Sequence, residues 1–116
     1  YIKDKKLERE GTGSITEVGK GRAKGSILNI PLPPPGISNS SVLTFNDVDY
    51  AALFHYLIMP VSQEFSPDLV LVAAGFDAVK GDILGQSKMV LSPDGFATMV
   101  SLLKTLAKGK IVLALE

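Results

Sequence analysis

The chain has 116 residues, is 46% hydrophobic and carries a formal net charge of zero. This length suits one domain or part of one, and the apolar content is sufficient for a buried core. A zero net charge gives no bulk reason to bind nucleic acid or an anionic membrane, so neither is expected as a partner. The absence of cysteine excludes disulfides and cysteine-based zinc sites. No stretch reaches the roughly 20 apolar residues that span a bilayer.

The N-terminal residues 1–25 are polar and glycine-rich, which predicts a loop region. Within it, Gly19-Lys-Gly-Arg-Ala-Lys-Gly25 has the composition of a phosphate-binding loop. Such loops follow a strand and open a helix, whereas this one precedes an apolar run, so we interpret it as a solvated loop. The polar start is not a signal peptide, and the missing initial Met suggests a processed or partial product.

The first two elements follow in order. Residues 26–32 are apolar and are stopped by prolines, which predicts a short strand near 27–31. A helix is expected near 47–63, capped by Asn46 or Asp47, because apolar residues recur there at a 3.6-residue spacing. Pro60 should kink this helix or end its regular part.

Two further strands flank a second helix. Residues 69–74 and 110–116 are apolar without alternation, which is typical of parallel strands covered on both faces. Between them, Ser92 and Pro93 predict the cap and first position of a helix near 93–107. Residues 26–116 therefore predict the order strand-helix-strand-helix-strand.

This order indicates an α/β fold with parallel strands and right-handed crossovers. Three strands and two helices cannot cover both faces of a sheet, and no helix follows the last strand, so we expect flanking sequence to be missing. An open edge and an uncovered apolar face would make the isolated chain aggregation-prone or partly folded.

Asp77 is the most informative candidate, because it lies just past a buried strand, where open α/β sheets collect ligands. A carboxylate there can bind a metal or act as a base, although position alone favours an ordinary turn aspartate. Asp82 in the same loop has a stronger claim to be a simple turn residue. His55, the sole histidine, is interpreted as structural or surface, so no histidine-based catalytic set is available. Leu84 suits either a pocket lining or a small satellite core.

Pro67-Asp-Leu-Val-Leu-Val-Ala-Ala-Gly-Phe-Asp-Ala78 resembles the metal-binding strand and loop of class II histone deacetylases, and Gly81-Asp-Ile-Leu-Gly85 resembles the pocket loop that follows. The likeness continues through Ser92-Pro-Asp-Gly-Phe96 and runs from about residue 11 to the end. It implies part of an arginase–deacetylase fold, mainly a parallel sheet with crossover helices. The chain would be the C-terminal part of the catalytic domain only.

The resemblance also implies an activity, namely hydrolysis of the acetyl amide of acetyl-lysine with zinc as cofactor. In that family two aspartates and one histidine hold the zinc; Asp77 matches the second aspartate, and Leu84 matches a residue of the channel that admits the acetyl-lysine. The implied substrates are acetylated histones or other acetyl-lysine proteins. Corepressor-type protein partners, a role in chromatin regulation, and a nuclear or cytoplasmic location are implied in the same way.

Several family elements are absent from the chain: the upstream Asp-x-His and paired histidines, and the downstream Gly-Gly-Tyr. No catalytic residue is therefore expected in this segment, which should be inactive alone. Glu8-Arg-Glu10 replaces the aromatics and proline that usually wall the channel, and Ile83 replaces a usual proline. The first ten residues are therefore expected to belong to a divergent or aberrant N-terminus. A truncated or divergent deacetylase-like protein that acts through partner binding is the alternative. A small nucleotide- or metal-binding module is the third possibility.

Overall fold

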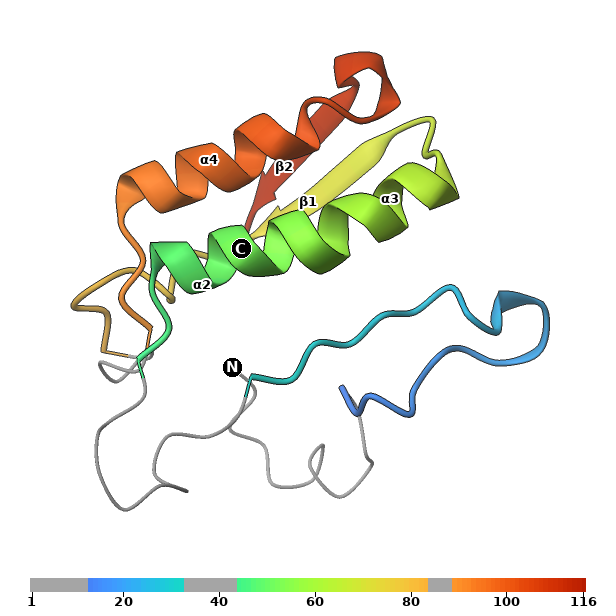
Figure 1. Ribbon diagram of the computed structural model, residues 1–116, viewed down its shortest axis with the longest axis horizontal. Coiled ribbons are helices and arrows are strands. Elements are labelled where there is room, and N and C mark those ends of the chain that lie inside the picture. Colours follow the sequence, from blue (N-terminus) through green and yellow to red (C-terminus); the bar gives the residue numbers. More distant parts are fainter. Residues whose placement is uncertain (1–12, 33–43, 84–88) are drawn as a thin grey trace. The chain divides into compact units, whose positions relative to one another are not determined.

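The computed structural model describes residues 13–32, 44–83 and 89–116 (Figure 1). They belong to two compact units, one within residues 1–37 and the other within residues 38–116. Across the described residues, no helix combines the length and apolarity that crossing a membrane requires.

The described part of the first unit, residues 13–32, is held by turns and contains no strand. It includes the short 3-10 helix η1 (Gly21–Ala23), and the Asn29 side-chain amide donates hydrogen bonds to the carbonyl oxygens of Ser14 (2.9 Å) and Glu17 (3.3 Å). The prediction of a strand near 27–31 is wrong, because residues 25–32 form no strand. A strand needs a neighbour for its N–H and C=O groups, and the described residues supply none here.

The second unit begins with one long helix in three parts: α2 (Asp47–Leu53), η2 (Phe54–Ile58) and α3 (Met59–Phe65). Asn46 caps it as predicted: its side-chain oxygen accepts from the Val48 amide at 2.8 Å. In return, the Asp49 carboxylate accepts from the Asn46 amide at 2.9 Å. This reciprocal pair is a capping box, which fixes where the helix starts.

The helix continues through Pro60 to Phe65, so Pro60 does not end it. The predicted irregularity lies just before the proline, where η2 is π-helical and the Met59 amide bonds to the carbonyl of Phe54, five residues back. Proline donates no hydrogen bond and its ring crowds the carbonyl four residues back, so a wider turn at this place accommodates it.

The strands β1 (Val70–Ala74) and β2 (Ile111–Leu115) pair in parallel, as predicted, with Val70 opposite Ile111 and Ala74 opposite Leu115. Between them lie α4 (Pro93–Leu103) and the 3-10 turn η3 (Ala107–Gly109). The helix α4 ends at Leu103, four residues before the predicted end at 107. The chain then passes through left-handed backbone at all three residues of η3, which no continuing α-helix could contain.

Within the described residues, β1 is covered on one face, whereas β2 is exposed at every residue except Ile111, and Leu115 is 83% exposed. Burial alternates along β1, so that Val70, Val72 and Ala74 are protected while Leu71 is 72% exposed. Its register partner Val112 is 52% exposed. The apolar runs predict strands that are covered on both faces, but the described residues do not cover the face that carries Leu71 and Val112. An uncovered apolar face, as expected for part of a larger sheet, is therefore present among the described residues.

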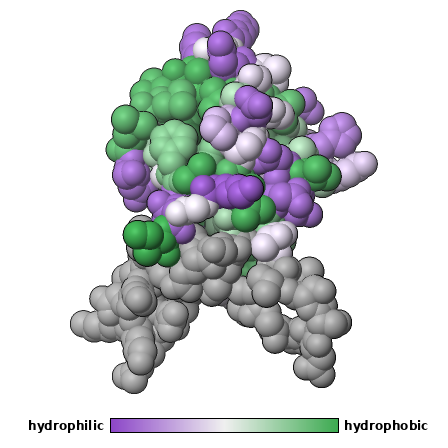
Figure 2. All heavy atoms as spheres, turned by 90° about the vertical axis from the view of Figure 1, so that its left-hand side faces the viewer, coloured by the Kyte–Doolittle hydropathy of each residue, from purple (hydrophilic) through white to green (hydrophobic). Residues whose placement is uncertain are grey.

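The covered face meets the helices. Helices α2 and α4 contact each other and run side by side next to the strands (Figure 1). Among the residues that the structure describes, the buried hydrophobic ones are few: Met59, Ala74, Leu91 and Leu106. Figure 2, which views the left-hand side of Figure 1, shows hydrophobic side chains gathered on one flank beside a mixed, more polar surface.

Candidate functional site

The loop that follows β1 is compact and carries the first candidate residue. It turns twice: the Val79 amide donates to the Phe76 carbonyl at 3.0 Å, and the Asp82 amide donates to the Val79 carbonyl at 3.1 Å. Asp77 lies in the first turn and is half-buried. The prediction that Asp77 lies just beyond the carboxyl end of a strand is therefore confirmed as a matter of position.

This strand-end loop is tied to the segment in front of α4. The Leu91 amide donates to the Ala78 carbonyl at 3.1 Å, and the Lys80 amide donates to the Leu91 carbonyl at 3.0 Å. Val79 and Leu91 thereby form an isolated parallel bridge. Leu91 is fully buried, with 0% of its side chain exposed, so the bridge has an apolar anchor.

Tyr50 on α2 is a neighbour of this loop. Burial raises the pKa of the Tyr50 hydroxyl, and the negative charge of Asp77 raises it further. The hydroxyl donates a weak hydrogen bond to the Met89 sulfur at 3.5 Å. The ring of Phe76, the residue before Asp77, meets the ring of Phe96 edge to face with centroids 5.0 Å apart. Tyr50 and this aromatic pair are thus the neighbours of the Asp77 turn that the structure identifies.

A second carboxylate, Asp47 at the start of α2, binds the start of α4. Its Oδ1 accepts from the Ser92 amide at 2.8 Å and its Oδ2 accepts from the Ser92 hydroxyl at 2.6 Å. The Ser92 oxygen in turn accepts from the Gly95 amide at 3.1 Å and so caps α4. The bonds from the Ser92 hydroxyl and then its amide lower the pKa of Asp47.

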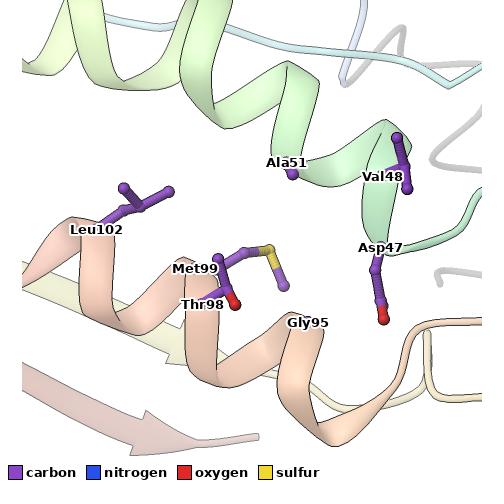
Figure 3. Close-up of a pocket in the computed structure, with 7 residues that line it drawn as sticks. All are labelled: Asp47, Val48, Ala51, Gly95, Thr98, Met99 and Leu102. Carbon is purple, nitrogen blue, oxygen red and sulfur yellow. The ribbon is translucent and has the colours of Figure 1, made fainter.

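A hollow of about 280 Å³ lies between α2 and α4 (Figure 3). The Met99 side chain points into it, and the lining is mostly apolar. The lining residues are Asp47, Val48, Ala51, Gly95, Thr98, Met99 and Leu102. Asp77 does not line this hollow, so the space belongs to the helix–helix packing and not to the strand-end loop.

The other predicted candidates fall in different places. Asp82 is half-buried in the second turn of the strand-end loop. His55 is exposed on η2, where its ring meets that of Tyr56 edge to face, so its interpretation as a surface residue is confirmed. Leu84 lies outside the described residues. The glycine-rich basic loop contains η1 and belongs to the first unit.

Within residues 13–32, 44–83 and 89–116, no group of three or more His, Cys, Asp or Glu side chains could hold a metal ion. Catalytic zinc takes about three protein ligands and an open position. The described residues therefore do not by themselves make a complete zinc site. Sequence reasoning treated Asp47 only as a cap, because nothing local signals its bond to a serine 45 positions away.

The model of the histone deacetylase domain family matches residues 10–116. Histone deacetylase 4 of Caenorhabditis briggsae is 41% identical over 106 residues, and Histone deacetylase 7 of Homo sapiens is 40% identical over 110. Each alignment covers 91% of this chain but 11% of the relative. Polyamine deacetylase HDAC10 of Danio rerio is 41% identical over 101 residues, which are 87% of this chain and 14% of that protein.

Two solved structures are also similar. The histone deacetylase Clr3 has a TM-score of 0.77 and 38% identity, covering 90% of this chain and 16% of that one. The HDA15 HD domain has a TM-score of 0.76 and 35% identity, and the match covers 91% of this chain and 27% of that one. The chain thus spans a small part of the length of each relative. The predicted arginase–deacetylase fold is confirmed, and the chain belongs to the histone deacetylase family.

Proposed function

We propose that this chain is one segment of the catalytic domain of a zinc-dependent deacetylase, which hydrolyses the acetyl amide of acetyl-lysine in histones or other proteins. The observation that carries this proposal is the position of Asp77. Its carboxylate follows the carboxyl end of β1, half-buried and beside Tyr50, within the stretch most similar to the family's metal loop. Family membership over residues 10–116 supports the reaction class.

Asp77 would act as a direct ligand of the metal. Bound zinc supplies a Lewis acid for the amide carbonyl and activates water near neutral pH. The aspartate side chain is short, so its oxygen position follows closely from the backbone of the strand-end loop. Leu84, which follows this loop, would line the channel for the acetyl-lysine side chain.

The segment alone would be inactive. One carboxylate cannot replace about three zinc ligands, and the described residues contain no second group that completes the set. His55 is exposed on η2 and lacks the position of a general base. Corepressor-type protein partners and a nuclear or cytoplasmic location belong to the proposal on family grounds alone.

The test is zinc content by atomic spectroscopy together with turnover, in the full-length gene product and in its Asp77→Ala and Asp82→Ala variants. We expect Asp77→Ala to lose zinc and to abolish turnover, and Asp82→Ala to cost less. An acetyl-lysine peptide and an acetylated polyamine are compared as substrates, since one relative is a polyamine deacetylase. Full zinc occupancy with normal turnover in Asp77→Ala would refute the ligand role. Turnover by the 116-residue chain would refute its inactivity.

A non-catalytic, truncated or divergent deacetylase-like protein that binds partners is the second candidate. It is favoured by Ile83, which occupies a usual proline position. A full-length gene product without zinc and without turnover of either substrate would establish this second candidate.

A further inference from the structure

The N-terminal end of α2 is bonded to the segment 89–92 at two levels. The Val90 amide donates to the carbonyl of Phe45 at 2.9 Å, so the backbones meet just before the helix begins. Two residues further on, the carboxylate oxygens of Asp47 accept hydrogen bonds from the amide and the hydroxyl of Ser92, at 2.8 Å and 2.6 Å.

The fit between Asp47 and α4 leaves no room for a larger residue at Gly95. A Cβ placed at Gly95 would lie 2.7 Å from Cγ of Asp47, closer than real contacts allow. Gly95 is buried, and it is also the residue whose amide Ser92 caps. The Asp47 carboxylate therefore packs directly against the first turn of α4.

From Ser92 the connection continues into the strand-end loop. The next residue back, Leu91, is bonded on both sides: its amide to Ala78 at 3.1 Å and its carbonyl to Lys80 at 3.0 Å. Ala78 directly follows Asp77. The Asp47 carboxylate is thus connected to the loop that carries Asp77 by two pairs of hydrogen bonds. The first pair joins Asp47 to Ser92, and the second joins Leu91 to Ala78 and Lys80.

We propose that Asp47 is a positioning residue for Asp77: it fixes Ser92 and Leu91, and through them the loop that presents the Asp77 carboxylate. The inference rests on the proposed zinc-ligand role of Asp77. Metal ligands depend on the groups that hold them, and losing such support typically weakens metal binding or activity about 10- to 100-fold. Because the bond between Phe45 and Val90 remains without Asp47, the loop should loosen rather than detach.

The test uses the full-length gene product with Asp47→Ala and Asp47→Asn. Asparagine keeps the size and one acceptor oxygen, so it preserves a bond to the Ser92 amide and loses the bond from the hydroxyl. Asp94→Asn is the matched control, because Asp94 is an exposed carboxylate in the first turn of α4. The readouts are amide hydrogen exchange at Lys80 and Leu91, zinc affinity by chelator competition, and kcat and KM separately.

For Asp47→Ala we expect faster exchange at both amides, zinc affinity lower by on the order of tenfold, and a loss that falls on kcat more than on KM. Asp47→Asn should lie between Asp47→Ala and the unchanged protein, and it carries the test if the alanine variant does not fold. Asp94→Asn should leave all readouts unchanged. A folded Asp47 variant that has a lower Tm but normal zinc affinity and kcat would overturn the proposal, as would equal losses in Asp94→Asn.

Asp77→Ala, measured beside these variants, separates the two proposals. If Asp77→Ala retains zinc, the ligand role fails and this positioning role fails with it. If Asp77→Ala loses zinc while Asp47→Ala does not, the ligand role stands and only the positioning role of Asp47 is overturned.

Discussion

The uncovered face of the sheet should make the isolated 116-residue chain self-associate, and one charge should suppress this. Leu71 on β1 and its register partner Val112 on β2 point away from the helices and are 72% and 52% exposed. Ala73 and Ala114 continue the same face. We expect Leu71→Lys to shift the chain toward monomer by placing a charged group in the middle of this apolar strip.

The size of the effect follows from the exposed fractions. Leu71 and Val112 together expose slightly more than one complete side chain. Burying a Leu or Val side chain contributes about 1.5–3 kcal/mol, so two copies packed face to face would gain about 4–7 kcal/mol. Association itself costs about 4 kcal/mol or more. The surplus is small, so dimers should form only at high concentration, with larger aggregates growing from the open strand edges.

Replacing Leu71 removes about 2 kcal/mol or more from such a pair, which corresponds to at least about thirtyfold in the association constant. Sedimentation velocity over a concentration series measures this, with Ile15→Lys as the control. Ile15 is 69% exposed, nearly as much as Leu71, but lies outside the sheet. Equal shifts for Leu71→Lys and Ile15→Lys would refute the role of this face. A soluble monomer with a sharp cooperative melt would refute the expectation of self-association and partial folding altogether.

The remaining predictions concern the full-length gene product. Leu91→Ala should destabilise it by about 3 kcal/mol, because it opens a cavity at a fully buried side chain; chemical denaturation measures this. Gly95→Ala should cost about 1–3 kcal/mol by the same measurement, despite the better helix propensity of alanine, because the new Cβ meets Asp47. Asn46→Ala should cost about 1 kcal/mol through the lost cap of α2. Because Ser92 lowers the pKa of Asp47, that contact stabilises above about pH 4 and is lost as the pH falls through the lowered pKa. The Tm difference between wild type and Asp47→Asn should therefore shrink in acid.

Local signals in the sequence predicted the helices and two of the three strands. Asn46 and Ser92 act as caps where their residue types indicate, because capping depends on a few neighbouring amides. The apolar run at 27–31 predicts a strand that the structure does not contain. A strand forms only when a second strand supplies hydrogen-bond partners, and the local sequence does not encode that partner. A proline likewise predicts an irregularity but not its form, and Pro60 is tolerated inside a helix that widens just before it.

The candidate site also has a part that local sequence predicts and a part that it does not. The position of Asp77 just past β1 follows from the order of residues, so it is predictable from the sequence. The contacts that hold its loop join Asp47 to Ser92 and Ala78 to Leu91, pairs that are distant along the chain. No periodicity or local motif encodes such pairs. The sequence alone therefore identifies Asp47 only as a possible cap of α2, although the structure shows that it binds Ser92 at the start of α4.

Two independent features of the chain point to the same requirement. A parallel strand run without alternation is stable when both faces are covered, yet Leu71 and Val112 remain open on one face. A catalytic zinc site needs about three protein ligands, yet the described residues contain no group of three or more His, Cys, Asp or Glu side chains that could hold a metal ion. The loop that carries the Asp77 carboxylate is nevertheless well held, by turns, by a bridge to a fully buried leucine and by Asp47. If Asp77 is the zinc ligand that we propose, its loop holds one ligand in place, and other residues of the domain would supply the remaining ligands and the cover of the open sheet face.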